Sequence, residues 1–213
     1  MEKKYFLTLG FTLIIAFNHL NGQVIHITTN LNLPISITID SGELYFDQDD
    51  NGVISKIDVD PINPTPSLVA NTFTRSLANY NGYLYSSESD GIKKFDLNDA
   101  PPIVPTYLTT SPAGALAFHG SDLYYVSGVD LFKIDVNDAT PTATLFFSGL
   151  SQGADDMNFD GDTLYILVAS DGNQNTGEIN KINILDAVPT LINVITGLNF
   201  PRGFAIKNNE LFY

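Results

Sequence analysis

One phrase of sequence occurs five times in this chain, at a spacing close to 40 residues. Each copy is a short apolar run, a polar turn and a pair of the Leu-Tyr type, as in ISITIDSGELYF and ALAFHGSDLYY. The leucines of the pairs are Leu44, Leu84, Leu123, Leu164 and Leu211, separated by 40, 39, 41 and 47 residues. A period of this length is typical of folds that repeat one supersecondary unit, so it constrains the architecture more than any other feature.

Each repeat has the pattern of four antiparallel strands. In the first repeat, apolar and polar residues alternate over Ile35–Asp40, and further strands are expected at Leu44–Phe46, Val53–Val59 and Ser67–Ala70. No segment carries a helical apolar stripe. Four antiparallel strands per unit, repeated radially, make the blade of a β-propeller. We therefore predict an all-β propeller with about four and a half four-stranded blades.

The ends of the chain indicate an incomplete ring. The predicted blades cover residues 35–73, 74–110, 111–150 and 151–197, with a partial blade at 198–213. Residues 24–29 are expected to be the closing strand of a last blade that is absent. We interpret the sequence as a fragment of a propeller with about six blades; a four-bladed ring with unusual closure is the alternative. An open arc would expose strand edges, so self-association is expected.

The N-terminus has the pattern of a signal peptide at residues 1–22, ahead of a propeller domain at residues 23–213. Lys3 and Lys4 precede the apolar stretch Tyr5–Phe17, and cleavage is expected before Gln23. A membrane anchor is the alternative, but the apolar run is shorter than the ~20 residues that a span needs. We expect a secreted or cell-surface protein with no membrane span after cleavage.

The LYF…ISKID and LYY…LFKID patterns resemble the propeller repeats of the low-density-lipoprotein-receptor class. They are also similar to the wider six-bladed TolB-like superfamily, which includes NHL-repeat and gluconolactonase-type proteins, and to degenerate repeats of exported Bacteroidetes proteins. The Trp of the receptor-class repeat is absent, because the chain contains no Trp. The resemblance implies the fold and leaves the activity open.

Charge and composition exclude several classes of function. The chain has 24 acidic and 10 basic residues; without Glu2, Lys3 and Lys4 of the leader it has 23 and 8, a net charge of −15. Such a surface repels nucleic acid and suits divalent cations, cationic partners or solubility alone. The absence of Cys excludes thiol catalysis and cysteine-ligated metals.

One hairpin loop has the spacing of a calcium loop. Asp47, Asp49 and Asn51 alternate ahead of Gly52, and Ser55 stands at the ninth position of the loop. Carboxylate and amide oxygens in this order can converge on one Ca²⁺, the one cofactor that the sequence suggests. The alternative is an ordinary turn, since Asp, Asn and Gly are common turn formers.

The equivalent loop of the fourth repeat offers a weaker candidate. Asp171, Asn173 and Asn175 alternate similarly, but only one of them is charged. A plain surface loop is the alternative explanation.

The position nine residues before each repeat leucine is expected at the mouth of the central channel, where each innermost strand begins. It holds Ile35, Arg75, Gly114, Asp155 and Arg202. A scaffold position should look alike in every blade, as the Leu-Tyr pair does, so this variation indicates a surface that can face a ligand. The ligand-face candidates are Arg75, Asp155, Asp156, Asn158 and Arg202. The alternative is that residues at loop ends simply vary.

These observations favour an exported binding module that holds a protein or a glycan through its loop-rich face and is stabilised by Ca²⁺. The alternative is a metal-dependent hydrolase or lyase of the gluconolactonase type. In that case Asp155, Asp156 and Asn158 would supply part of a site that further blades complete. A third possibility is a remnant without function. No residue is assigned a catalytic role.

Overall fold

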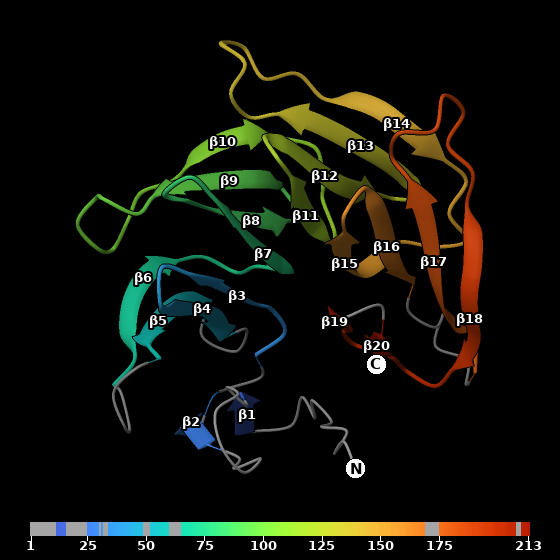
Figure 1. The fold of residues 1–213 in the computed structure, drawn as a ribbon. Helices are drawn as coiled ribbons and strands as arrows, with labels where there is room; N and C mark the ends of the chain where they lie inside the picture. Colours follow the sequence, from blue (N-terminus) through green and yellow to red (C-terminus); the bar gives the residue numbers. More distant parts are fainter. Residues whose placement is uncertain are drawn as a thin grey trace.

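The computed structural model describes residues 12–15, 25–29, 31, 34–48, 52–59, 65–168, 175–207 and 210–213. Within these residues the chain is all-β, and four four-stranded antiparallel sheets are arranged as the blades of a propeller (Figure 1). This confirms the predicted fold class. The further prediction of an incomplete six-bladed ring stays a prediction.

Each blade runs from its innermost to its outermost strand in chain order. The first blade contains β3 (Ile37–Asp40), β4 (Glu43–Gln48), β5 (Val53–Asp58) and β6 (Ser67–Asn71). The second contains β7 (Ser76–Tyr80), β8 (Tyr83–Glu88), β9 (Gly91–Asp96) and β10 (Thr106–Thr109). The third contains β11 (Leu116–His119), β12 (Asp122–Ser127), β13 (Asp130–Asp135) and β14 (Thr144–Ser148). The fourth contains β15 (Ala154–Asp160), β16 (Thr163–Val168), β17 (Gly177–Asn183) and β18 (Ile192–Leu198).

Two hairpins accompany the blades. β19 (Ala205–Lys207) pairs with β20 (Glu210–Phe212), and β19 lies next to β15 at the centre of the molecule (Figure 1). β1 (Thr12–Ile15) pairs with β2 (Ile25–Thr29) in a separate two-stranded sheet. The segment expected to close a last blade is thus joined here to residues of the expected leader. The leader and the closing strand both stay predictions.

The repeated leucines form the core of each blade. Leu44, Leu84, Leu123 and Leu164 are 2 % exposed or less, and each faces an Ile or Phe of the third strand of its own blade. The tyrosine that follows the leucine packs toward the next blade. Tyr45, for example, shares a buried cluster with Leu84 of the second blade. The Leu-Tyr pair therefore joins the core of one blade to its neighbour, which explains why it recurs.

The Lys-Ile-Asp part of the repeat also has scaffold roles. Lys56 Nζ lies 2.6 Å from a carboxylate oxygen of Glu43, and Lys133 Nζ lies 2.7 Å from Asp122. The aspartates that end the third strands close turns; Asp135 Oδ1, for example, accepts a hydrogen bond from the backbone of Asn137 at 3.0 Å.

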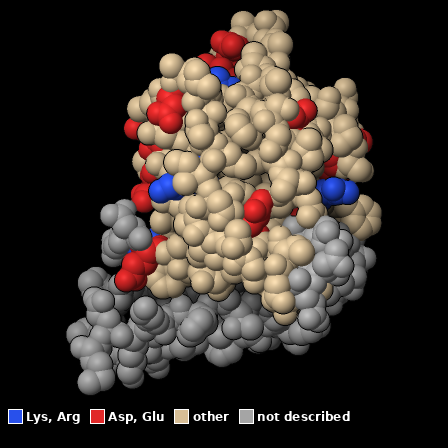
Figure 2. Space-filling view, turned by 90° about the vertical axis from the view of Figure 1, so that its right-hand side faces the viewer, with Lys and Arg blue, Asp and Glu red and all other residues tan. Residues whose placement is uncertain are grey.

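Short hairpins connect the first two strands of each blade. In the second blade Asn81 and Gly82 have φ of 50° and 78°, which Asn and Gly adopt most easily. On the side of the molecule that Figure 2 shows, acidic groups are scattered singly over a mostly uncharged surface.

Candidate functional site

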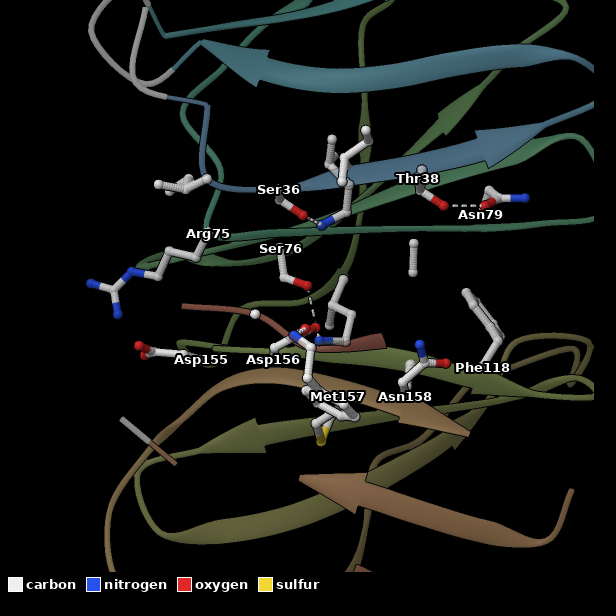
Figure 3. Close-up of a pocket in the computed structure, with 18 of the residues that line it drawn as sticks. Ser36, Thr38, Arg75, Ser76, Asn79, Phe118, Asp155, Asp156, Met157 and Asn158 are labelled. Atoms are coloured by element: carbon white, nitrogen blue, oxygen red, sulfur yellow. Dashed lines mark hydrogen bonds between the residues drawn. The ribbon is translucent and has the colours of Figure 1, made fainter. Parts of the chain in front are cut away.

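A cavity of about 310 Å³ lies on the propeller axis. It is bounded by residues of β3, β7, β11 and β15 and of the segment that leads into β19. Five parts of the chain that are far apart in sequence therefore meet around one space (Figure 3). All five predicted ligand-face residues line this cavity: Arg75, Asp155, Asp156, Asn158 and Arg202.

Hydrogen bonds between successive blades form part of the cavity wall. The acceptor in each bond is a side chain at one repeat position, eight residues before the leucine of its own repeat. The donor is a backbone N–H of a neighbouring repeat, seven residues before the leucine of that repeat (Figure 3). The bonds run from Leu77 N to Ser36 Oγ at 2.7 Å, from Leu116 N to Ser76 Oγ at 3.1 Å and from Phe204 N to Asp156 Oδ2 at 3.0 Å. The third blade has Ala115 at this position and no side-chain acceptor there. These bonds hold neighbouring innermost strands at the distance that keeps the cavity open.

Asp156 combines this structural role with a raised pKa. Burial raises the pKa of its carboxyl to about 6, although hydrogen bonds from the backbone N–H groups of Phe204 and Met157 act to lower it. The nearby Asp155 carboxylate raises the pKa further. Asp156 lines the cavity, as predicted for a ligand-face residue, but one carboxylate oxygen already serves the scaffold.

Three charged side chains stand at the mouth of the cavity: Arg75, Asp155 and Arg202. Arg202 Nη1 lies 3.9 Å from Asp155 Oδ2, and the Arg202 side chain is 74 % exposed. Arg75 and Asp155 point toward the same end of the cavity (Figure 3). Burial raises the pKa of Asp155, because it outweighs the opposing charges of Arg202 and Arg75. Among the described residues, no carboxylate lies within ion-pair distance of Arg75.

Apolar and polar side chains both contribute to the cavity wall. Leu116, Phe118 and Met157 contribute hydrocarbon and thioether surface. The Thr38 hydroxyl donates a hydrogen bond to Asn79 Oδ1, so these two groups satisfy each other. The Asn158 amide lies beside Phe118 (Figure 3) and has no side-chain hydrogen bond within the part of the chain that is described. Its donor and acceptor are therefore available to a ligand.

The first residue of the expected calcium loop also has a structural role. Asp47 is 1 % exposed, and its Oδ1 accepts hydrogen bonds from Ile35 N at 2.9 Å and Ser36 N at 2.8 Å. The carboxylate thereby holds the chain that leads into β3, next to the cavity. Sequence spacing did not reveal this role, because a turn motif does not say which way its first side chain points.

The other expected calcium ligands lie only partly within the described residues. Ser55 Oγ accepts a hydrogen bond from Gln48 Nε2 at 3.1 Å, whereas Asp49 and Asn51 lie outside the described residues. The same holds for Asp171 and Asn173 of the weaker candidate loop, and Asn175 is exposed with φ of 61°. Calcium at either loop stays a prediction.

Among the described residues, no group of three or more His, Cys, Asp or Glu side chains comes together as a metal site would require. No helix in the described part has the length and apolar character needed to cross a membrane.

Comparison with known proteins supports the fold alone. No protein-family model matches this chain, and neither does any curated protein. A chain in the crystal structure of a nidogen/laminin complex superposes with a TM-score of 0.70 at 11 % identity, covering 88 % of this chain and 74 % of that one. A computationally designed protein called Ika8 gives a TM-score of 0.51 at 11 % identity, covering 89 % and 70 % of the two chains. The chain is thus a β-propeller, defined by its blades rather than by close relatives.

Proposed function

We propose that this chain is a binding module that holds a protein partner on the face where the axial cavity opens. The observation that carries the proposal is the convergence of Arg75, Asp155 and Arg202 at the cavity mouth. They come from the second blade, the fourth blade and the segment before β19, and none belongs to the repeated Leu-Tyr or Lys-Ile-Asp scaffold. Binding surfaces are commonly built from charged side chains at loop ends that a rigid framework holds in place.

The similar nidogen/laminin structure contains a complex between proteins, which supports a protein as the partner. The remaining parts of the proposal rest on the sequence: export through residues 1–22, a six-bladed TolB-like type, and a glycan as the alternative ligand. The enzyme alternative has no specific observation in its favour.

Calcium at the Asp47–Gly52 loop is a separate part of the proposal. Its test is the melting temperature with Ca²⁺ and with a chelator, for the parent and for Asp49→Ala. We expect Ca²⁺ to raise the melting temperature of the parent only. An equal rise in both proteins would show that this loop is not the site. Asp49 is chosen because Asp47 already holds the backbone that leads into β3.

The binding face can be tested with single cysteines, because the natural chain has none. A photo-crosslinker attached at Ile35→Cys, on the cavity mouth, is compared with one at Asp160→Cys, at the opposite end of β15. Both native side chains are exposed.

Crosslinking in medium and surface extract of the producing cells, followed by mass spectrometry, should give a partner from Ile35→Cys alone. The partner, once purified, should bind the unmodified chain and be displaced by a bulky group at position 35. The same products from both positions, or none from Ile35→Cys, would reject the proposed face.

A further inference from the structure

The chain has only two arginines, Arg75 and Arg202, and both stand at the mouth of one cavity. They are 127 residues apart in sequence. The chain also has 24 acidic residues, so partners for an arginine are plentiful. Even so, Arg202 comes no nearer than 3.9 Å to Asp155, and Arg75 has no ion pair among the described residues. The donors of both guanidinium groups remain available.

Two lysines of the repeat are closely paired. Lys56 and Lys133 lie 2.6 Å and 2.7 Å from carboxylates of their own blades. Among the described residues, neither guanidinium group at the cavity mouth has a carboxylate that close. A guanidinium group presents a planar fork of donors that matches a carboxylate or a phosphate.

The acidic side chains at the mouth decide between these two anions. Asp155 Oδ2 lies 3.9 Å from Arg202 Nη1, and Asp155 and Arg75 stand at the same end of the cavity (Figure 3). Asp156 lies next along β15 and also lines the cavity. The two carboxylates repel any anion, and they repel a dianion more strongly than a monoanion, so the two guanidinium groups are better able to hold a ligand with one negative charge. The mouth therefore suits a monoanion.

The body of the cavity restricts the rest of the ligand. Its volume of about 310 Å³ is at the small end of the range for ligand pockets. Several polar wall groups already bond within the protein, and the surfaces of Leu116, Phe118 and Met157 are apolar. Asn158 remains as one polar group for the ligand body. The cavity fits a compact molecule with an apolar part that can pack against these side chains.

We propose that the axial cavity binds a small monocarboxylic acid with an apolar body. The carboxylate lies between the guanidinium groups of Arg75 and Arg202, and the body packs against Leu116 and Met157 beside the Asn158 amide. This inference goes beyond the protein-binding function and does not depend on it, because the ligand is a small molecule bound by the purified chain alone.

Isothermal titration calorimetry with three probes of one shape tests the proposal. Phenylacetate carries one negative charge, phenylacetamide carries none, and phenyl phosphate carries close to two at neutral pH. We expect phenylacetate to bind with a stoichiometry of one, and each of the other two to bind at least tenfold more weakly. Tighter binding of phenyl phosphate, equal binding of phenylacetamide, or no phenylacetate binding at 10 mM would each overturn the proposal.

Variants test the assigned residues. Arg75→Gln and Arg202→Gln should each weaken phenylacetate binding at least tenfold, and Arg75→Lys should restore only part of the loss because it lacks the fork. Lys207→Gln removes an exposed positive charge that stands at the end of β19 and does not line the cavity, and it should bind as the parent does. Thermal melts confirm that each variant is folded. If Lys207→Gln weakened phenylacetate binding as much as the arginine variants do, the loss would be explained by net charge alone. That result would contradict the assignment of Arg75 and Arg202.

Discussion

Ionisation of the Asp156 carboxyl should destabilise the folded state at neutral pH relative to mildly acidic pH. Burial raises its pKa from the ordinary 3.8 to about 6 in the folded state. Each pKa unit corresponds to about 1.4 kcal/mol, so ionised Asp156 destabilises the folded state by roughly 3 kcal/mol at pH 7. Because the folded state binds the proton more tightly, this contribution to stability is complete below pH 3.8, is lost between pH 3.8 and about 6, and stays lost above.

Asp156→Asn isolates this effect. The amide oxygen can still accept the hydrogen bond from Phe204 N, but it carries no charge. We expect the free energy of unfolding at pH 7 to rise by up to about 3 kcal/mol and the gain over the parent to vanish near pH 3.5. Asp156→Ala serves as the control, because it removes both the charge and the acceptor. It should be less stable than Asp156→Asn at every pH by about 1–3 kcal/mol.

The assay is urea unfolding, followed by circular dichroism, at several pH values between 3.5 and 7. The quantity to compare is the difference between variant and parent, since other carboxylates titrate equally in both. A difference between Asp156→Asn and the parent that does not change with pH would refute the reasoning. It would show that the Asp156 carboxylate is as well stabilised in the cavity wall as it is in water.

Three further predictions concern the scaffold. Ser36→Ala and Ser76→Ala should each lower the free energy of unfolding by about 1–3 kcal/mol in urea denaturation, since each leaves a backbone N–H of the next blade unpaired. Asp47→Ala should cost more than either, because its carboxylate serves two backbone N–H groups; a cost below that of Ser36→Ala would contradict this role. Leu123→Ala should cost about 2–5 kcal/mol, measured in the same way, because Leu123 is fully buried in the third blade.

Much of the fold was open to prediction because its signal is repeated. The Leu-Tyr pair must fill the same volume in every blade, so the same residue types return at a spacing near 40. The residues of the cavity mouth were predictable because they vary between repeats, whereas the scaffold residues recur. Positions where Arg75, Asp155 and Arg202 stand differ from blade to blade, because the scaffold does not constrain them, and the structure places all of them at the cavity.

Contacts between blades could not be predicted in the same way. The bond from Leu77 N to Ser36 depends on how far one blade is rotated about the axis relative to the next, and no spacing within one repeat encodes that angle. A Ser at the same position of two successive repeats was the available signal, and Asp156 in the fourth repeat follows it. The sequence motif around Asp47 is that of a turn or a metal loop. Such a motif carries no information on the direction of the side chain, which in the structure is buried and bonds to the backbone.

The two arginines permit one direct measurement of the central claim, that the cavity mouth is a binding site served by both. With ¹⁵N-labelled protein, the arginine side-chain Nε–Hε region of an NMR spectrum should contain two signals, one each from Arg75 and Arg202. Arg75→Gln assigns them. On titration with phenylacetate, both signals should shift along saturating curves with the same dissociation constant, and phenylacetamide should leave them in place. Signals that stay still, or that move in a straight line without saturation, would contradict the account.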